Sequence, residues 1–142
     1  MPSHPILRPA DLTSRTLDDS LDWDSTIPWL RSITNLQIWL KGVTSPEDVA
    51  LAIRHKLDGV IVSNHGGQQL DGQPATLDAL RDCAPVAAGK IPIALDGGIR
   101  RGSDIFKAIA MGATAVFVGR IPIWGLAVRS FELCPQVIPA DT

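Results

Sequence analysis

Apolar runs alternate with amphipathic segments along most of the chain. Runs made almost entirely of apolar residues predict four strands, at residues 37–42, 59–64, 92–98 and 115–120. Apolar residues at helical spacing predict three intervening helices, at residues 45–56, 75–87 and 102–112. Near-continuous apolar strands separated by helices are typical of parallel strands buried on both faces. The pattern therefore predicts an α/β fold with about four βα units.

Small polar residues indicate where the helices begin. Ser45, followed by a proline, is the predicted N-cap of the helix after the first strand. Ser103 is the predicted N-cap of the helix after the third strand. A further short helix is predicted at residues 22–34, where Asp24 or Ser25 can serve as the N-cap.

Polar residues cluster directly after each predicted strand. They are Lys41, the triplet 63–65, the triplet 96–98, and Gly119 with Arg120. Ligand sites occupy this carboxyl edge both in (β/α)8 barrels and in open doubly wound sheets, so the pattern alone leaves both folds open. The spacing between clusters is a little under the roughly 30 residues per unit of a barrel and favours that fold. We therefore predict a TIM-barrel type fold with four of its eight units.

The ends of the chain differ in composition from its middle. Residues 1–20 are rich in proline, serine, threonine and aspartate and predict a flexible arm. The partial barrel is expected over residues 21–127, followed by an irregular tail at 128–142. Pro135 and Pro139 argue against a long helix there, so the barrel is expected to lack its final helix.

Charge and hydropathy restrict the partners. A net charge of −2 without a basic block favours neither nucleic acid nor an anionic membrane. The apolar runs are shorter than the roughly 20 residues of a membrane span, and neither end resembles a secretory signal or a Ser-Lys-Leu peroxisomal signal. Cys83 and Cys134 show no metal-binding or redox spacing. We expect a cytoplasmic protein that acts on a small molecule and has no metal site.

Two of the clustered side chains can carry chemistry. His65 follows a strand and precedes two glycines, where an imidazole can accept a proton from a substrate hydroxyl. The alternative is a loop histidine that only binds the backbone. Lys41 ends a buried strand, where an ammonium is costly unless it meets an anion or an electron-rich ligand. The alternative is a lysine that extends into solvent.

The segment DGGIRRG at 96–102 indicates a phosphate site. Backbone N–H groups at a glycine-rich helix start, together with arginines, bind phosphate. The segment VGR at 118–120 can supply the second half. The alternative is a glycine-rich connection with solvated arginines, but the paired occurrence favours phosphate. The tryptophans are interpreted as packing residues: Trp23, Trp29, Trp39 and Trp124.

These motifs together resemble a known family. LKGV, GVIVSNHGGQQLDG, IPIALDGGIRRGSDIFKAIAMGA and VFVGR resemble segments of the FMN-dependent 2-hydroxy acid oxidases and dehydrogenases, which include glycolate oxidase, lactate oxidase and flavocytochrome b2. The resemblance covers about residues 22–127 and implies strands 5–8 of a TIM barrel. It also implies an FMN cofactor and oxidation of a 2-hydroxy acid to the 2-oxo acid.

The resemblance implies roles for individual residues. His65 would be the base that takes the substrate proton, Lys41 would lie at the flavin edge, and Ser63 would contact the flavin ring system. The residues expected to hold the ribityl phosphate end are Asp96, Gly97, Gly98, Ile99, Arg100, Gly119 and Arg120.

Two departures from the family pattern affect the expected function. Gln68 stands where the family has an arginine that pairs with the substrate carboxylate, and an amide supplies neither charge nor a bidentate fork. The family's N-terminal half, with the aspartate that orients the histidine, has no counterpart, so a homo-oligomer or a complementing chain is expected. The alternative is a truncated, catalytically degenerate relative that binds a phosphate ligand or a protein partner without turnover.

Overall fold

A computed structural model describes residues 20–129. The chain divides into two compact units, residues 1–34 and 35–142. The predicted arm at 1–20 lies outside the described residues except for its last position, and Cys134 and most of the predicted tail also lie outside them.

The first unit contains one described helix, α2 (Trp23–Ile33). Its N-cap is Asp22, whose Oδ1 accepts a 2.9 Å hydrogen bond from the Ser25 backbone N–H. The prediction of Asp24 or Ser25 as the cap is wrong, because Asp22 is the last residue with extended backbone and its carboxylate reaches the first turn. The hydrogen bonds from Ser25 lower the pKa of Asp22.

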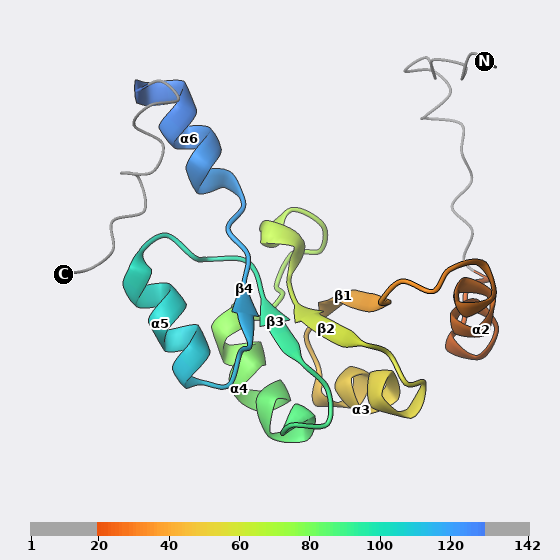
Figure 1. Ribbon diagram of the computed structural model, residues 1–142. Helices are drawn as coiled ribbons and strands as arrows, with labels where there is room; N and C mark the ends of the chain where they lie inside the picture. The colour runs from red at the N-terminus through yellow and green to blue at the C-terminus, as the bar shows by residue number, and fades with distance from the viewer. Residues whose placement is uncertain (1–19, 130–142) are drawn as a thin grey trace, which may run out of the picture. The chain divides into compact units, whose positions relative to one another are not determined.

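The second unit is built on a parallel sheet with the strand order β1-β2-β3-β4 (Figure 1). The strands are β1 (Trp39–Val43), β2 (Gly59–Val62), β3 (Ile93–Leu95) and β4 (Ala115–Val116). The helices between them are α3 (Pro46–Arg54), α4 (Thr76–Ala87) and α5 (Gly102–Ala110), with the short η1 segment (His65–Gly67) after β2.

The strand order and the placement of the helices decide between the two predicted folds. Each strand pairs with the next one in the sequence, and α3, α4 and α5 lie on the same side of the sheet in Figure 1. A doubly wound sheet reverses its strand order and carries helices on both faces. The observed arrangement is that of a barrel segment, which confirms the predicted partial (β/α)8 fold.

The core lies between the sheet and its helices. Val60, Val62 and Leu95 on the strands are fully buried, as are Leu80 and Cys83 of α4. Each such side chain contributes about 1.5–3 kcal/mol of hydrophobic stabilisation. Burial also raises the pKa of the Cys83 thiol to about 11, which fits its interpretation as an ordinary structural thiol.

The opposite face of the sheet, the open face, is only partly covered among the described residues: Lys41 and Ala115 are exposed, Ile61 is half-buried and Ala94 is buried. Successive strands align Lys41, Ile61, Ala94 and Ala115 in one row. Side chains in such a row point to the same face, while Val60 and Val62 point to the helices. In a closed barrel this row would face the interior.

The ends of two predicted elements require correction. Ser103 lies inside α5, whose N-cap is Arg101, because the chain remains extended until Arg101. The predicted strand 115–120 ends at Val116, and the helix α6 (Arg120–Arg129) follows it, so the expectation that no helix follows the fourth strand is wrong. Pro122 is compatible with this helix because it lies in the first turn, where a backbone N–H has no helical partner.

The Ser45 cap is confirmed, since its Oγ accepts a 3.2 Å hydrogen bond from the Asp48 N–H. Within residues 20–129, the helices are all too short or too polar to cross a membrane.

Candidate functional site

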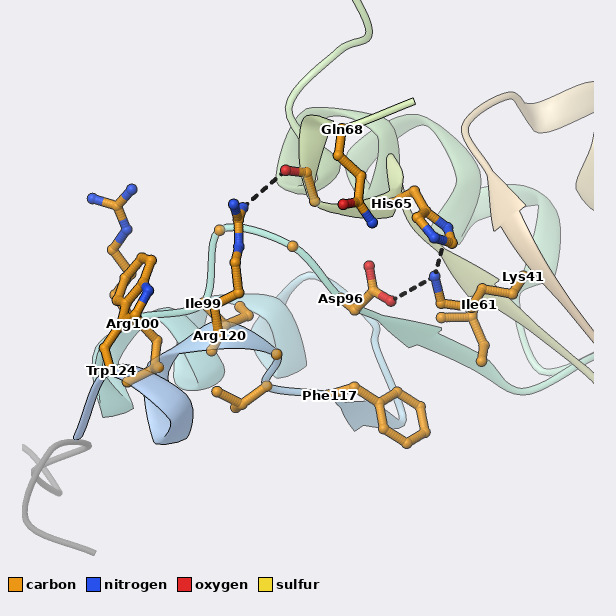
Figure 2. Close-up of a pocket in the computed structure, with 16 residues that line it drawn as sticks. Lys41, Ile61, His65, Gln68, Asp96, Ile99, Arg100, Phe117, Arg120 and Trp124 are labelled. Atoms are coloured by element: carbon orange, nitrogen blue, oxygen red, sulfur yellow. Dashed lines mark hydrogen bonds and ion pairs between the residues drawn. The ribbon is translucent and has the colours of Figure 1, made fainter. Parts of the chain in front are cut away.

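A cavity of about 590 Å³ lies at the carboxyl ends of the strands (Figure 2). Small-molecule sites commonly have volumes of about 300–1,000 Å³. Every residue of the predicted site lines this cavity except Ser63. The structure therefore brings together side chains that are spread over residues 41–120 of the sequence.

Lys41 is the centre of a polar cluster at one end of the cavity. A β-bulge at Gly42, whose φ is +101°, shifts the register directly after Lys41. The Lys41 Nζ lies 3.1 Å from the Asp96 Oδ2 and donates a 3.0 Å hydrogen bond to the Ser63 Oγ. The ammonium is thus paired with an anion, although 43% of the Lys41 side chain is exposed. Solvent limits such a pair to about 1 kcal/mol or less.

Ser63 does not line the cavity and supports this cluster from its buried side. It is 1% exposed, and its Oγ accepts hydrogen bonds from the Lys41 ammonium and from the His65 backbone N–H at 3.1 Å. The hydroxyl therefore holds both residues in place. The flavin contact implied for Ser63 stays a prediction.

His65 is exposed and lies next to the Lys41 ammonium. The His65 Nδ1 is 3.5 Å from the Lys41 Nζ, and Figure 2 shows Lys41 reaching toward both His65 and Asp96. An ammonium can only donate, so a hydrogen bond here would need an unprotonated Nδ1 and would place the proton of the neutral imidazole on Nε2. Gln68 lines the same cavity three residues later.

The turn that carries His65 has left-handed backbone. The φ angles of His65, Gly66 and Gly67 are +56°, +71° and +74°. Glycine adopts this conformation without a steric penalty, whereas histidine does not. The two glycines after His65 thus allow a turn that other residues would resist.

The other end of the cavity carries the glycine-rich loop after β3. Gly97, with φ +88°, accepts a 2.8 Å hydrogen bond from Thr76 Oγ1 at its carbonyl. A Cβ at Gly97 would lie 3.1 Å from both Asn64 Oδ1 and Thr76 Cγ2. The loop therefore approaches α4 and the turn after β2 too closely for a larger residue.

Asp104 fixes the end of this loop. Its Oδ2 accepts 3.0 Å hydrogen bonds from the backbone N–H groups of Arg100 and Arg101. The bond from Arg100 is the main reason that the pKa of Asp104 is lowered. Because these two N–H groups are used, backbone donors for an anion must come from Gly98, Ile99 or the Gly119 region, together with the arginine side chains.

Arg120 links the two ends of the cavity. Its Nη2 donates a 2.9 Å hydrogen bond to the Gly66 carbonyl in the His65 turn (Figure 2). The ring centroid of Trp124 lies 6.0 Å from the Arg120 Cζ, the outer limit of a cation–π contact.

Apolar lining residues were missed in the sequence. Ile61, Phe117 and Trp124 line the cavity, and Phe117 and Trp124 are 51% and 48% exposed. The interpretation of Trp124 as a packing residue is therefore incomplete. Strand alternation could have identified Ile61, two positions before Ser63, whereas Trp124 lies on the helix that was not predicted.

Comparisons with known proteins agree with this site. Residues 3–136 match the family model described as FMN-dependent dehydrogenase. Oxidase FUB9 of Gibberella fujikuroi is 62% identical over 112 residues, which cover 79% of this chain and 31% of that protein. 2-Hydroxyacid oxidase 1 of Mus musculus is 50% identical over 120 residues, covering 84% and 32%. The chain thus spans about a third of the length of these curated relatives.

Solved structures show the same fold. Mandelate oxidase with benzoyl-formic acid superposes with a TM-score of 0.74 at 37% identity, over 82% of this chain and 36% of that one. A complex of the same enzyme with (S)-4-hydroxymandelic acid gives the same TM-score and identity, over 34% of its chain.

Proposed function

Because the chain belongs to the family of FMN-dependent dehydrogenases, we propose that the protein binds FMN and oxidises a 2-hydroxy acid to the 2-oxo acid. The observation that carries this proposal is a single cavity that joins Lys41 and His65 at one end to Arg100 and Arg120 at the other. Relatives named 2-hydroxyacid oxidase and mandelate oxidase support the substrate class.

The cavity fits a flavin mononucleotide in its chemistry. Phe117 and Ile61 offer apolar surface to a ring system, and the loop from Gly97 to Arg100 is shaped by glycines that leave space for a phosphate. Asp96 is the exception in the predicted phosphate-binding set, because its carboxylate is paired with Lys41 and would repel a phosphate. We assign Asp96 to holding Lys41 and leave phosphate binding to the glycines and arginines.

His65 and Lys41 have separate tasks in this proposal. His65 accepts the proton of the substrate hydroxyl at the ring nitrogen that is unprotonated in the neutral imidazole, while the two electrons leave the substrate α-carbon with its hydrogen. FMN, when bound, receives those electrons. Lys41 provides positive charge beside the reacting groups, and Asp96 and Ser63 keep the ammonium in position.

The alternative of a relative without turnover has no independent support. It was suggested by Gln68 and by the missing N-terminal half. All other groups that the resemblance requires in this part of the family are present in the described residues. The relatives compared above carry the names of oxidases.

Assembly and location extend the proposal. The open face of the sheet supports a second copy or a complementing chain as the partner that completes the barrel.

One matched relative is named peroxisomal (S)-2-hydroxyacid oxidase GLO3, so a cytoplasmic location stays a prediction. Imaging of an internally tagged protein in its native cell would test the location.

The proposed function is tested by flavin retention and flavin reduction. The purified chain is incubated with FMN and desalted, and a visible spectrum is recorded before and after anaerobic addition of a 2-hydroxy acid. We expect a retained flavin spectrum that bleaches on reduction. His65→Gln should keep the flavin and slow bleaching by at least about 100-fold.

His55→Gln, the same substitution at the end of α3, is the matched control and should bleach at the wild-type rate. A protein that retains no FMN alone, and none when mixed with the family's N-terminal half, would contradict the proposal. Equal bleaching by His65→Gln and His55→Gln would contradict the role of His65.

A further inference from the structure

The turn that presents His65 combines disfavoured backbone angles with a contact from a distant segment. Three consecutive positive φ angles begin at a histidine, an L-residue that this conformation disfavours. Two hydrogen bonds come from the segment itself: the His65 N–H donates to Ser63 Oγ, and the Gly67 N–H donates to the Asn64 carbonyl at 3.0 Å. The Gly66 carbonyl takes part in neither bond and accepts its hydrogen bond from a different segment.

Arg120 supplies that donor from the far side of the cavity. The 2.9 Å bond from its Nη2 joins residues that are 54 positions apart in the sequence. A Cβ added to Gly66 would lie 3.4 Å from the same Nη2, so the guanidinium packs directly on the turn. Figure 2 shows Arg120 extending from the start of α6 to this carbonyl.

Arg120 also lines the cavity together with the residues assigned to the cofactor phosphate. Its guanidinium carries five N–H donors, and the bond to Gly66 uses one nitrogen of the fork. Gly119 and Ile99, which are assigned to the phosphate end, line the same cavity as Arg120. One side chain is therefore able to hold an anion and the His65 turn together.

We propose that Arg120 is a positioning residue that couples the occupancy of the phosphate end of the cavity to the conformation of the His65 turn. The coupling rests on the proposed FMN site for its ligand, but the contact between Arg120 and the turn stands without it. A bound phosphate fixes the guanidinium, the guanidinium fixes the Gly66 carbonyl, and the turn then holds the imidazole in place.

Hydrogen exchange of the full chain without flavin tests the contact itself. The reporters are the His65 and Gly67 backbone amides, both of which donate hydrogen bonds within the turn. Arg120→Gln should accelerate exchange of these amides by about tenfold or more. Arg101→Gln removes the same charge from an exposed side chain that does not line the cavity, so it should leave the exchange unchanged.

Arg120→Lys keeps a positive charge but offers a point donor in place of the fork. It should give intermediate exchange and carries the test if circular dichroism shows that Arg120→Gln is unfolded. Wild-type exchange at His65 and Gly67 in the folded Arg120 variants would overturn the proposal.

The coupling is tested with FMN and a 2-hydroxy acid. FMN should slow exchange of the two reporter amides in the wild type and not in Arg120→Gln. At saturating FMN, Arg120→Gln should reduce flavin about tenfold more slowly than the wild type, with unchanged substrate affinity. If Arg120 only held the phosphate, FMN affinity would fall and the rate at saturation would not, which would overturn the coupling. Failure of the wild type to bind FMN would instead contradict the proposed function, while the flavin-free exchange would still decide the contact.

Discussion

At the scale of single residues, Gln68 is the position where this chain departs from the arginine of the family pattern. It lines the cavity within three residues of His65, and its amide can donate and accept hydrogen bonds without charge. A carboxylate bound there would lack a charged partner from this position. Pairs between a carboxylate and a guanidinium are stronger and geometrically better defined than pairs with an amide.

We predict that Gln68→Arg raises turnover of a small 2-hydroxy acid by about tenfold or more. Truncating one partner of a buried charged pair costs about 2–5 kcal/mol, and solvent in the open cavity reduces the gain from such a pair. The measurement is the initial rate of anaerobic flavin reduction against substrate concentration. Gln69→Arg is the matched control, since Gln69 is exposed and does not line the cavity. Equal rates for the two variants would show that another feature limits turnover.

Single residues could be predicted from sequence where the signal is local. Lys41 and His65 each follow a buried strand, and that position alone places them at the carboxyl edge. The contact between Arg120 and Gly66 could not be predicted, because it joins segments 54 positions apart through one side-chain conformation. The pairing of Asp96 with Lys41 was missed for a similar reason, since it joins the ends of β1 and β3 across the intervening strand β2.

At the scale of elements, the loop after β3 and helix α5 are joined by Asp104. This carboxylate, in the first turn of α5, accepts the N–H groups of Arg100 and Arg101. It thereby holds the loop that leads from Asp96 to the start of the helix. Ser103 was predicted as the cap because serine is a common N-cap residue. A carboxylate that accepts hydrogen bonds from two preceding backbone N–H groups has no simple sequence pattern.

Asp104→Ala should lower the free energy of unfolding by about 0.5–2 kcal/mol at pH 7, because two backbone donors lose their acceptor. The pKa of Asp104 is lowered in the folded protein from 3.8, so its stabilising contribution is present above pH 3.8 and is lost as the pH falls through the lower folded value. The difference between the variant and the wild type should therefore shrink in acid. Urea unfolding at several pH values measures both effects.

Asp78→Ala is the matched control for that experiment. Asp78 also lies in the first turn of its helix, but α4 has no side-chain hydrogen bond at its N-cap. A loss of stability as large in Asp78→Ala as in Asp104→Ala would show that charge near a helix N-terminus, and not the reach back to the loop, is responsible.

The elements themselves were largely predictable. Buried strands and amphipathic helices alternate with clear periods, and the structure confirms three crossover helices and four parallel strands. Helix α6 was missed because its apolar residues continue the fourth apolar run without a change of period. In addition, Pro122 suggested that no helix includes this position. The position of a proline within the first turn is only visible once the helix start is known.

At the scale of the whole molecule, the open face of the sheet leaves a surface that another chain can cover. The row on this face consists of Lys41, Ile61, Ala94 and Ala115. In a closed barrel the corresponding side chains point into the interior. Strands with unpaired edges readily pair with another chain. Four parallel strands are half of the eight that close a TIM barrel, so two copies related by a twofold axis can supply the full number.

We therefore predict that the isolated chain self-associates in a concentration-dependent manner, with β4 of one copy beside β1 of the other. Ala115→Lys places a charge on the exposed edge strand β4 and should weaken association by about tenfold or more, because desolvating an ammonium in a strand pairing is costly. Ala110→Lys makes the same change on an exposed position of α5 and should have little effect. Sedimentation equilibrium measures both constants. A chain that stays monomeric at high concentration, and gains a defined mass only when the family's N-terminal half is added, would identify the complementing chain as the partner and exclude the second copy.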